Sequence, residues 1–174
     1  MYFSNNRLNV LVELDFDGEI TSTYPKYDNG WEVTVDTDGT LTDKNGRQYN
    51  YLFWEGIPNK ELDFSTGFCV KGEDTLKFLE DALTKLSLTD KEQCDFITYW
   101  LPKMEGNKYN IISFQGDNYK EIAKLKTTPE VDTEIRVFMA WKPSDVWVNI
   151  EEQELKSTER KGFTLVEWGG SQVK

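Results

Sequence analysis

The first third of the chain alternates apolar and polar residues in the way that half-buried β-strands do. Every second residue from Val10 to Phe16 is apolar, so one face of this strand is predicted to be buried. Dipeptides typical of tight hairpin turns follow at Asp17-Gly18, Asp38-Gly39 and Asn45-Gly46. The first is expected to return the chain as an adjacent strand, EITSTY. Since short turns join antiparallel strands, residues 8–55 are predicted to form a β-meander.

The middle third changes to the period of an α-helix. Leucines recur at helical spacing at Leu76, Leu79, Leu83 and Leu86. After the short link SLT, Thr89 and Glu92 form a capping-box pattern that opens a second helix. The apolar stripe predicted for that helix is Cys94, Ile97, Trp100, Leu101 and Met104, with Phe96 beside it. Pro102 disfavours helical backbone at the residue before it, so the predicted αα-hairpin spans 73–101.

The last third returns to strand patterns between residues 109 and 168. The candidate strands are YNIISF, EIAKLKT, IRVFMAW, VWVNI and FTLVEW. Both faces of IRVFMAW are apolar apart from Arg136, as expected of a central strand. The order of elements predicts a single α+β domain over 1–174, with a mainly antiparallel sheet or sandwich of about nine strands and the inserted αα-hairpin.

Composition excludes several classes of partner. The 174 residues carry a net charge of −11, which repels phosphate backbones and anionic membrane surfaces, so nucleic-acid binding is not expected. We find no apolar run long enough for a membrane span or a signal peptide. A cytoplasmic protein is expected, with an extracytoplasmic location as the alternative if the chain has been trimmed.

The chain contains no His, which excludes His-based triads and His-ligated metals. Its two cysteines, Cys69 and Cys94, are interpreted as buried thiols. The acidic turn that begins at Asp36 does not match a calcium loop, because glycine follows directly after Asp38. We therefore predict no metal and no cofactor.

Two strand-like runs each end in Trp, Glu and Gly. Glu55 closes RQYNYLFWEG and Glu167 lies in FTLVEWGG. If the two ends met, the carboxyl groups could act as the acid and base of a hydrolase. The alternative is that each Glu marks the point where an apolar row reaches solvent, and this second interpretation is preferred.

Aromatic residues make up 14% of the chain, against 38% for all hydrophobic residues. Five tryptophans fall on predicted strands or at their ends: Trp31, Trp54, Trp141, Trp147 and Trp168. Such rings either fill a core or form a platform that binds a sugar or a peptide. The leading hypothesis is a non-enzymatic binding module for a glycan or peptide, using Trp31, Trp54 and Trp168. A hydrolase using Glu55 and Glu167, or a structural or assembly protein, are the alternatives.

Four stretches carry a resemblance that covers nearly the whole chain. They are TYPKYDNGWEVTVDTDGTLTDKNGRQYNYLFWEG, GFCVKGEDTLKFLEDALTKLSL, DFITYWLPKMEGNKYNIISF and ELKSTERKGFTLVEWGG. This pattern resembles a family of uncharacterised bacterial proteins common in Gram-positive species. Members often have a KPVIYLYP-like segment before the first strand, where this chain has MYFSNN. The resemblance implies one complete domain, and no functional residues follow from it because the family has no established activity.

Overall fold

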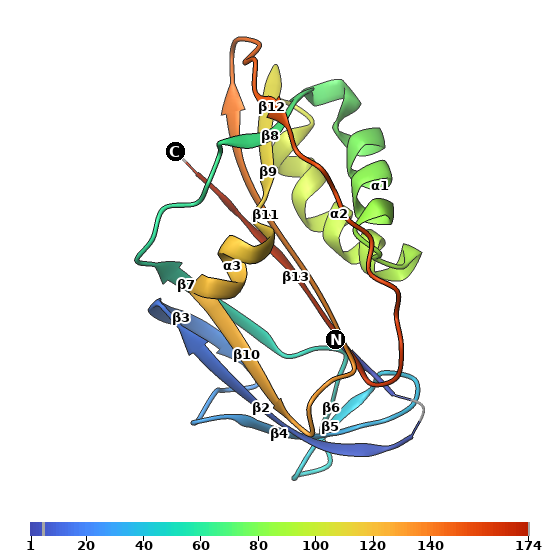
Figure 1. Cartoon of the computed structure of the whole chain (residues 1–174). Coiled ribbons are helices and arrows are strands. Elements are labelled where there is room, and N and C mark those ends of the chain that lie inside the picture. Colours follow the sequence, from blue (N-terminus) through green and yellow to red (C-terminus); the bar gives the residue numbers. More distant parts are fainter. Residues whose placement is uncertain (5, 174) are drawn as a thin grey trace. The chain divides into compact units, whose positions relative to one another are not determined.

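A computed structural model describes residues 1–4 and 6–173, which divide into two compact units (Figure 1). Each unit is built from three separate segments of the chain. The first unit comprises Met1–Glu61, Asp117–Glu134 and Arg160–Val166. The second comprises Leu62–Gly116, Ile135–Glu159 and the residues from Glu167 onward. Two strands continue from the first unit into the second: β11 (Thr133–Ser144) and β13 (Thr164–Gln172).

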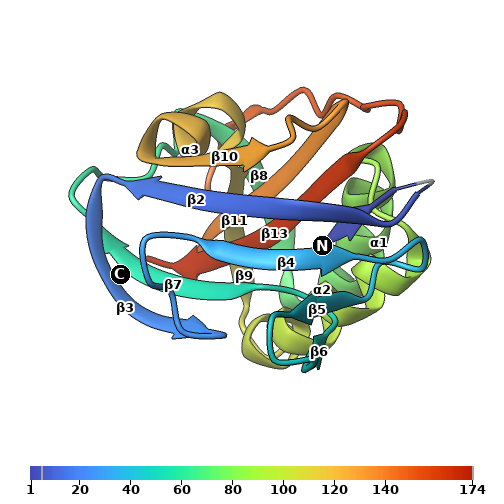
Figure 2. The ribbon, with the colours of Figure 1, turned by 90° about the horizontal axis from the view of Figure 1, so that it is seen from below.

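The first unit contains a five-stranded sheet in the order β10-β2-β4-β5-β6, with all neighbours antiparallel (Figure 2). Its strands are β2 (Leu8–Phe16), β4 (Trp31–Val35), β5 (Leu41–Asp43), β6 (Gln48–Tyr49) and β10 (Ala123–Thr128). The helix α3 (Gly116–Ile122) leads directly into β10, where only the strand EIAKLKT was predicted.

Alternation along β2 builds the core of the first unit, as the sequence predicts. Val10 and Val12 are buried and lie opposite Val33 and Trp31 of β4. The short strand β1 (Tyr2–Phe3) joins by pairing Tyr2 with Leu165 of β13. The buried cluster consists of Tyr2, Val10, Val12, Trp31, Val33, Val35, Leu41, Phe163 and Leu165.

Two of the three predicted hairpins are confirmed. Gly39 and Gly46 adopt positive φ angles of 87° and 80°, and their turns join β4 to β5 and β5 to β6. Positive φ is accessible to glycine without steric cost, which is why these dipeptides mark the turns so well.

The prediction of a hairpin at Asp17-Gly18 is wrong. The strand that follows, β3 (Gly18–Tyr24), pairs with β7 (Phe53–Pro58) in a separate two-stranded ribbon, while β2 lies between β10 and β4. Close packing, rather than a hairpin turn, explains why a glycine occupies position 18. A Cβ at Gly18 would lie 2.3 Å from the carbonyl oxygen of Ile57 and 2.6 Å from the Phe16 ring.

In the second unit, strands follow the order β13-β11-β9-β8-β12. The bounds are β8 (Thr66–Lys71), β9 (Tyr109–Phe114) and β12 (Glu151–Glu152). As predicted, β11 is central, and Met139, Ala140 and Trp141 are buried. The pairs β8–β9 and β9–β11 are antiparallel, whereas β12 runs parallel to β8. The predicted class, α+β with a mainly antiparallel sheet, is confirmed. Very short strands such as β1, β6 and β12 raise the count above the nine predicted.

The predicted αα-hairpin is present in the second unit, and Figure 1 shows its helices side by side. A 3₁₀ turn, η1 (Gly72–Asp74), precedes α1 (Thr75–Lys85), and α2 (Asp90–Met104) follows. The capping box is confirmed: the Thr89 N–H donates to the Glu92 carboxylate at 2.8 Å, and the Glu92 N–H points back to the Thr89 hydroxyl. Among the helices in residues 1–4 and 6–173, none is long and apolar enough to cross a membrane.

The end predicted for α2 at Leu101 is wrong. The helix continues through Pro102 to Met104, whose side chain is fully buried and fixes the last turn. Pro102 has no N–H to donate and so removes one intrahelical hydrogen bond, yet the helix continues for two more residues.

The predicted buried faces of both helices also need correction. Leu76 and Cys94 are exposed. Glu92 and Phe96 are buried on α2, so the buried face is centred on Phe96 rather than on Cys94. The residues that the helices bury are Thr75, Leu79, Ala82, Leu83, Glu92, Gln93, Phe96, Trp100 and Met104.

Candidate functional site

A groove of about 610 Å³ lies within the second unit. Its lining comes from three segments: Gly67–Val70 of β8, α1 between Phe78 and Lys85, and residues 147–155 before, in and after β12. In Figure 1 the chain after β12 runs alongside the helices. The concavity exists because β12 pairs with β8 only at Thr66 and Gly67, so the rest of residues 147–155 is held by other contacts.

Aromatic packing joins β8 to α1 in the lining of this groove. The rings of Phe68 and Phe78 lie 5.0 Å apart between centroids, and both side chains are partly exposed. On α1, Leu79 and Leu83 point into the core, which leaves Phe78 at the edge of the buried face. The part of the lining that β8 and α1 form around Phe68 and Phe78 is therefore apolar.

The lining segment 147–155 forms another wall and carries the most exposed tryptophan that the structure describes. Trp147 is 60% exposed and Val146 is 64% exposed, with the Trp147 ring edge-on to Tyr109 at 5.8 Å. The predicted strand VWVNI is wrong, because residues 147–150 have no regular structure and β12 begins at Glu151. Apolar side chains in this segment have no neighbouring strand to cover them.

Hydrogen bonds hold this wall in place at both ends. The Val148 N–H donates to the Cys69 sulfur at 3.4 Å. The Gln153 amide bonds both backbone groups of Phe114, donating to the carbonyl oxygen at 2.6 Å and accepting from the N–H at 2.9 Å. The groove is thus largely pre-formed, as small-ligand sites usually are.

Acidic side chains outnumber basic ones along the lining. Asp81, Glu152 and Glu154 carry negative charge, and Lys85 carries positive charge. Asp81 also forms an exposed ion pair with Lys77 at 2.7 Å, and the hydrogen bond to Asp81 raises the pKa of the Lys77 ammonium. The groove therefore favours neutral or cationic ligands over anionic ones.

Both cysteines are free thiols, and the prediction that they are buried is wrong. Cys94 is exposed on α2, while Cys69 is partly exposed and lines the groove. Among the described residues, no group of three or more His, Cys, Asp or Glu side chains is placed to hold a metal ion.

The three tryptophans proposed as a platform occupy different environments. Trp31 is 4% exposed in the core of the first unit, where its indole N–H donates to the Pro25 carbonyl oxygen at 2.8 Å. Trp54 is partly buried against the same core. Trp168, in the second unit, is partly buried and packs edge-on against Phe96 at 5.8 Å. A platform that includes Trp31 would need that ring to leave the core.

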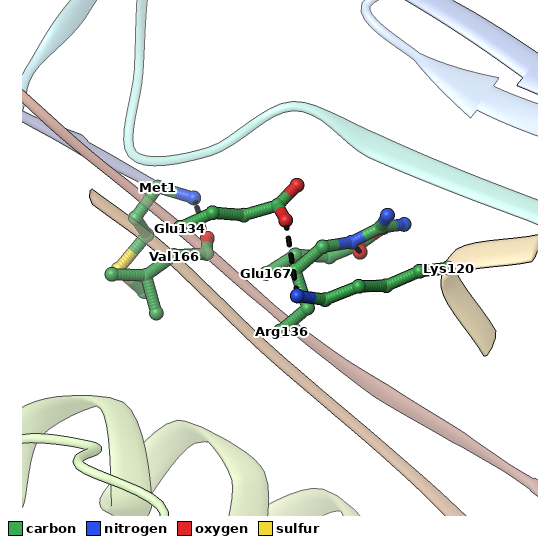
Figure 3. Close-up of polar contacts among 6 residues, drawn as sticks. All are labelled: Met1, Lys120, Glu134, Arg136, Val166 and Glu167. Atoms are coloured by element: carbon green, nitrogen blue, oxygen red, sulfur yellow. Dashed lines mark hydrogen bonds and ion pairs between the residues drawn. The ribbon is translucent and has the colours of Figure 1, made fainter. Parts of the chain in front are cut away.

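The two glutamates of the hydrolase hypothesis belong to different units. Glu55 is exposed on β7 in the first unit. Glu167, in the second, accepts a hydrogen bond from the Arg136 guanidinium at 2.5 Å (Figure 3). The side chain of Arg136 is only 2% exposed and that of Glu167 is 15% exposed. The negative charge of Glu167 thus compensates the buried positive charge of Arg136. A catalytic acid must be protonated, and protonation of Glu167 would remove this compensation.

A second group of exposed rings lies on the β3–β7 ribbon and the residues before it, in the first unit. Tyr24 is paired with Phe53 across the ribbon, and both are exposed, as is Tyr51. The Arg47 guanidinium lies 5.9 Å from the ring centroids of both Tyr24 and Tyr49. We call Tyr24, Tyr51 and Phe53 the ribbon aromatics.

Sequence reasoning placed Trp147 on a strand and so missed its place in the groove. A signal was available, since turn-forming residues precede it and the charged run EEQE follows it. The comparisons add no further signal: no protein-family model, curated protein or solved structure matches this chain. The resemblance to a Gram-positive bacterial family stays a prediction.

Proposed function

We propose that this protein is a non-enzymatic binding module that holds a peptide in the groove of the second unit. The observation that carries the proposal is a recess lined by the exposed Trp147 and by the Phe68–Phe78 pair. A partly exposed indole beside an apolar recess is a common anchor point for peptide side chains.

The lining favours a peptide over a glycan. Sugars present many hydroxyl groups, which need several side-chain donors and acceptors around a stacking ring. Among the described lining residues, the uncharged amides are Asn149 and Gln153, and Gln153 is already engaged by the backbone of Phe114. Apolar groups dominate the remaining lining and include Val70, Ile150 and Leu155.

The size of the groove sets the scale of the ligand. A volume of about 610 Å³ lies within the range typical of small-ligand pockets and accommodates a few side chains rather than a folded domain. A short linear segment is therefore the expected form of the ligand.

The test is a peptide array and a glycan array probed with the full chain and with Trp147→Ala. The matched control is Tyr99→Ala, which removes an exposed ring on α2 outside the groove lining. We expect peptide binding that Trp147→Ala weakens about tenfold or more and Tyr99→Ala leaves unchanged. Retention of glycans alone, or equal losses in both variants, would contradict the proposal.

A further inference from the structure

We infer that the peptide held in this groove carries basic side chains next to its apolar anchor. The inference rests on the proposed function and names the class of ligand for the same site. The wall formed by residues 147–155 carries negative charge on Glu152 and Glu154.

Two carboxylates belong to this wall. Glu152 and Glu154 flank Gln153, whose side chain bonds the backbone of Phe114, and both glutamates are exposed and line the groove. They form a pair of negative groups beside the apolar recess.

These two carboxylates are available to a ligand. Within residues 1–4 and 6–173, neither Glu152 nor Glu154 has an ion-pair partner, whereas Asp81 on α1 is paired with Lys77. Lys85 is the one cation among the described lining residues. A ligand ammonium or guanidinium group would therefore complete the charge balance of the groove, with the net charge of −11 adding a longer-range attraction.

Apolar and charged contacts have different signatures in this arrangement. Contacts with Trp147 and Phe78 bury apolar surface and are insensitive to salt. Contacts with the exposed Glu152 and Glu154 are screened, so their contribution falls as ionic strength rises. A basic, partly apolar peptide should show both kinds of dependence at one site.

The experiment measures binding of three fluorescent eight-residue peptides by anisotropy, using the full chain at low and moderate salt. The peptides alternate Leu with Lys, Leu with Gln, and Leu with Glu. We expect the Lys peptide to bind most tightly, by about tenfold over the Gln peptide at low salt, with the difference shrinking as salt is added. The Glu peptide should bind most weakly.

Two double variants separate local from general attraction. Glu152→Gln/Glu154→Gln should weaken the Lys peptide about tenfold and leave the Gln peptide unchanged. The control, Glu80→Gln/Glu105→Gln, removes the same charge from exposed positions of the second unit outside the lining, and should change binding less than about twofold.

Each alternative outcome has a distinct meaning. If all three peptides bind equally and Trp147→Ala weakens them, the proposed function stands and the inference of a basic ligand is overturned. Equal losses in both double variants also overturn it, because the attraction would then belong to the whole molecule. If none of the peptides binds at either salt concentration, while the peptide array is also silent, the proposed function itself fails.

Discussion

Similar sequence patterns adopt different structures in the two units, as Trp31 and Trp147 show. Both residues lie in short segments with alternating valines, WEVTV and VWVNI. In the first unit, β4 lies between β2 and β5, and Trp31 is buried. In the second, the segment around Trp147 has no flanking strand, and the ring is exposed. Strand propensity is therefore similar, and burial depends on whether partner strands are available.

The largest expected effect separates these two tryptophans directly. Trp31→Ala removes a buried ring and its hydrogen bond to Pro25, and should lower the free energy of unfolding by about 3–5 kcal/mol. Trp147→Ala should cost less than about 1 kcal/mol, because most of its surface is already in water. Urea unfolding of both variants measures the difference. Similar losses would contradict the difference between a buried ring and an exposed ring.

The next effect concerns the buried ion pair of the second unit. Arg136→Met leaves the Glu167 carboxylate without its main counter-charge and should cost about 3 kcal/mol. The double variant Arg136→Met/Glu167→Leu removes both charges and should recover most of that loss. Denaturant titrations of the two variants provide the measurement. A double variant as unstable as the single one would mean that the pair is needed for more than mutual compensation.

A smaller effect is expected at the start of α2. Thr89→Ala removes both the hydroxyl acceptor and the capping geometry, and should cost about 1 kcal/mol. Thr98→Ala is the matched control, because Thr98 is exposed on the same helix and bonds only to backbone carbonyl groups. Its change should stay within about 0.5 kcal/mol in thermal or urea unfolding. A reversed order would contradict the role of the cap.

The smallest effect is a pH dependence in the first unit. The backbone N–H of Arg47 donates to the Asp43 carboxylate and is the main cause that lowers its pKa below the ordinary value of 3.8; Asn45 and Tyr49 donate as well. A lowered folded-state pKa stabilises the fold above the unfolded-state value, and this contribution disappears as pH falls through the folded-state value. The stability difference between wild type and Asp43→Asn should therefore shrink below about pH 4.

Urea unfolding at neutral and acid pH checks the last expectation. Asp38→Asn is a control at the neighbouring turn, where the carboxylate accepts from the Thr40 N–H. A difference between wild type and Asp43→Asn that grows on acidification would contradict the assigned cause.

Local signals predicted local structure well. The glycines at 39 and 46 and the capping residues Thr89 and Glu92 all act where their dipeptides or spacing place them. Each of these features depends on interactions between residues that are close together in the sequence. The αα-hairpin and the central position of β11 follow from equally short patterns.

Features that depend on distant partners were not predictable from those patterns. The strand after Gly18 pairs with β7 rather than with β2, and only close packing around Gly18 explains the residue. The candidate groove is similarly assembled from β8, α1 and residues 147–155, which are far apart in sequence. No single sequence motif predicts this groove. The exposure of Trp147 points to it only once β12 is known to be so short.

The interleaving of the two units has a consequence for how the chain is made. Tyr2 is synthesised long before its register partner Leu165, which lies far along the chain. The second unit likewise includes residues that follow Glu167. So many long-range pairings imply a high contact order and slow folding. Both units include part of β13, so neither can complete its fold before that strand has been made.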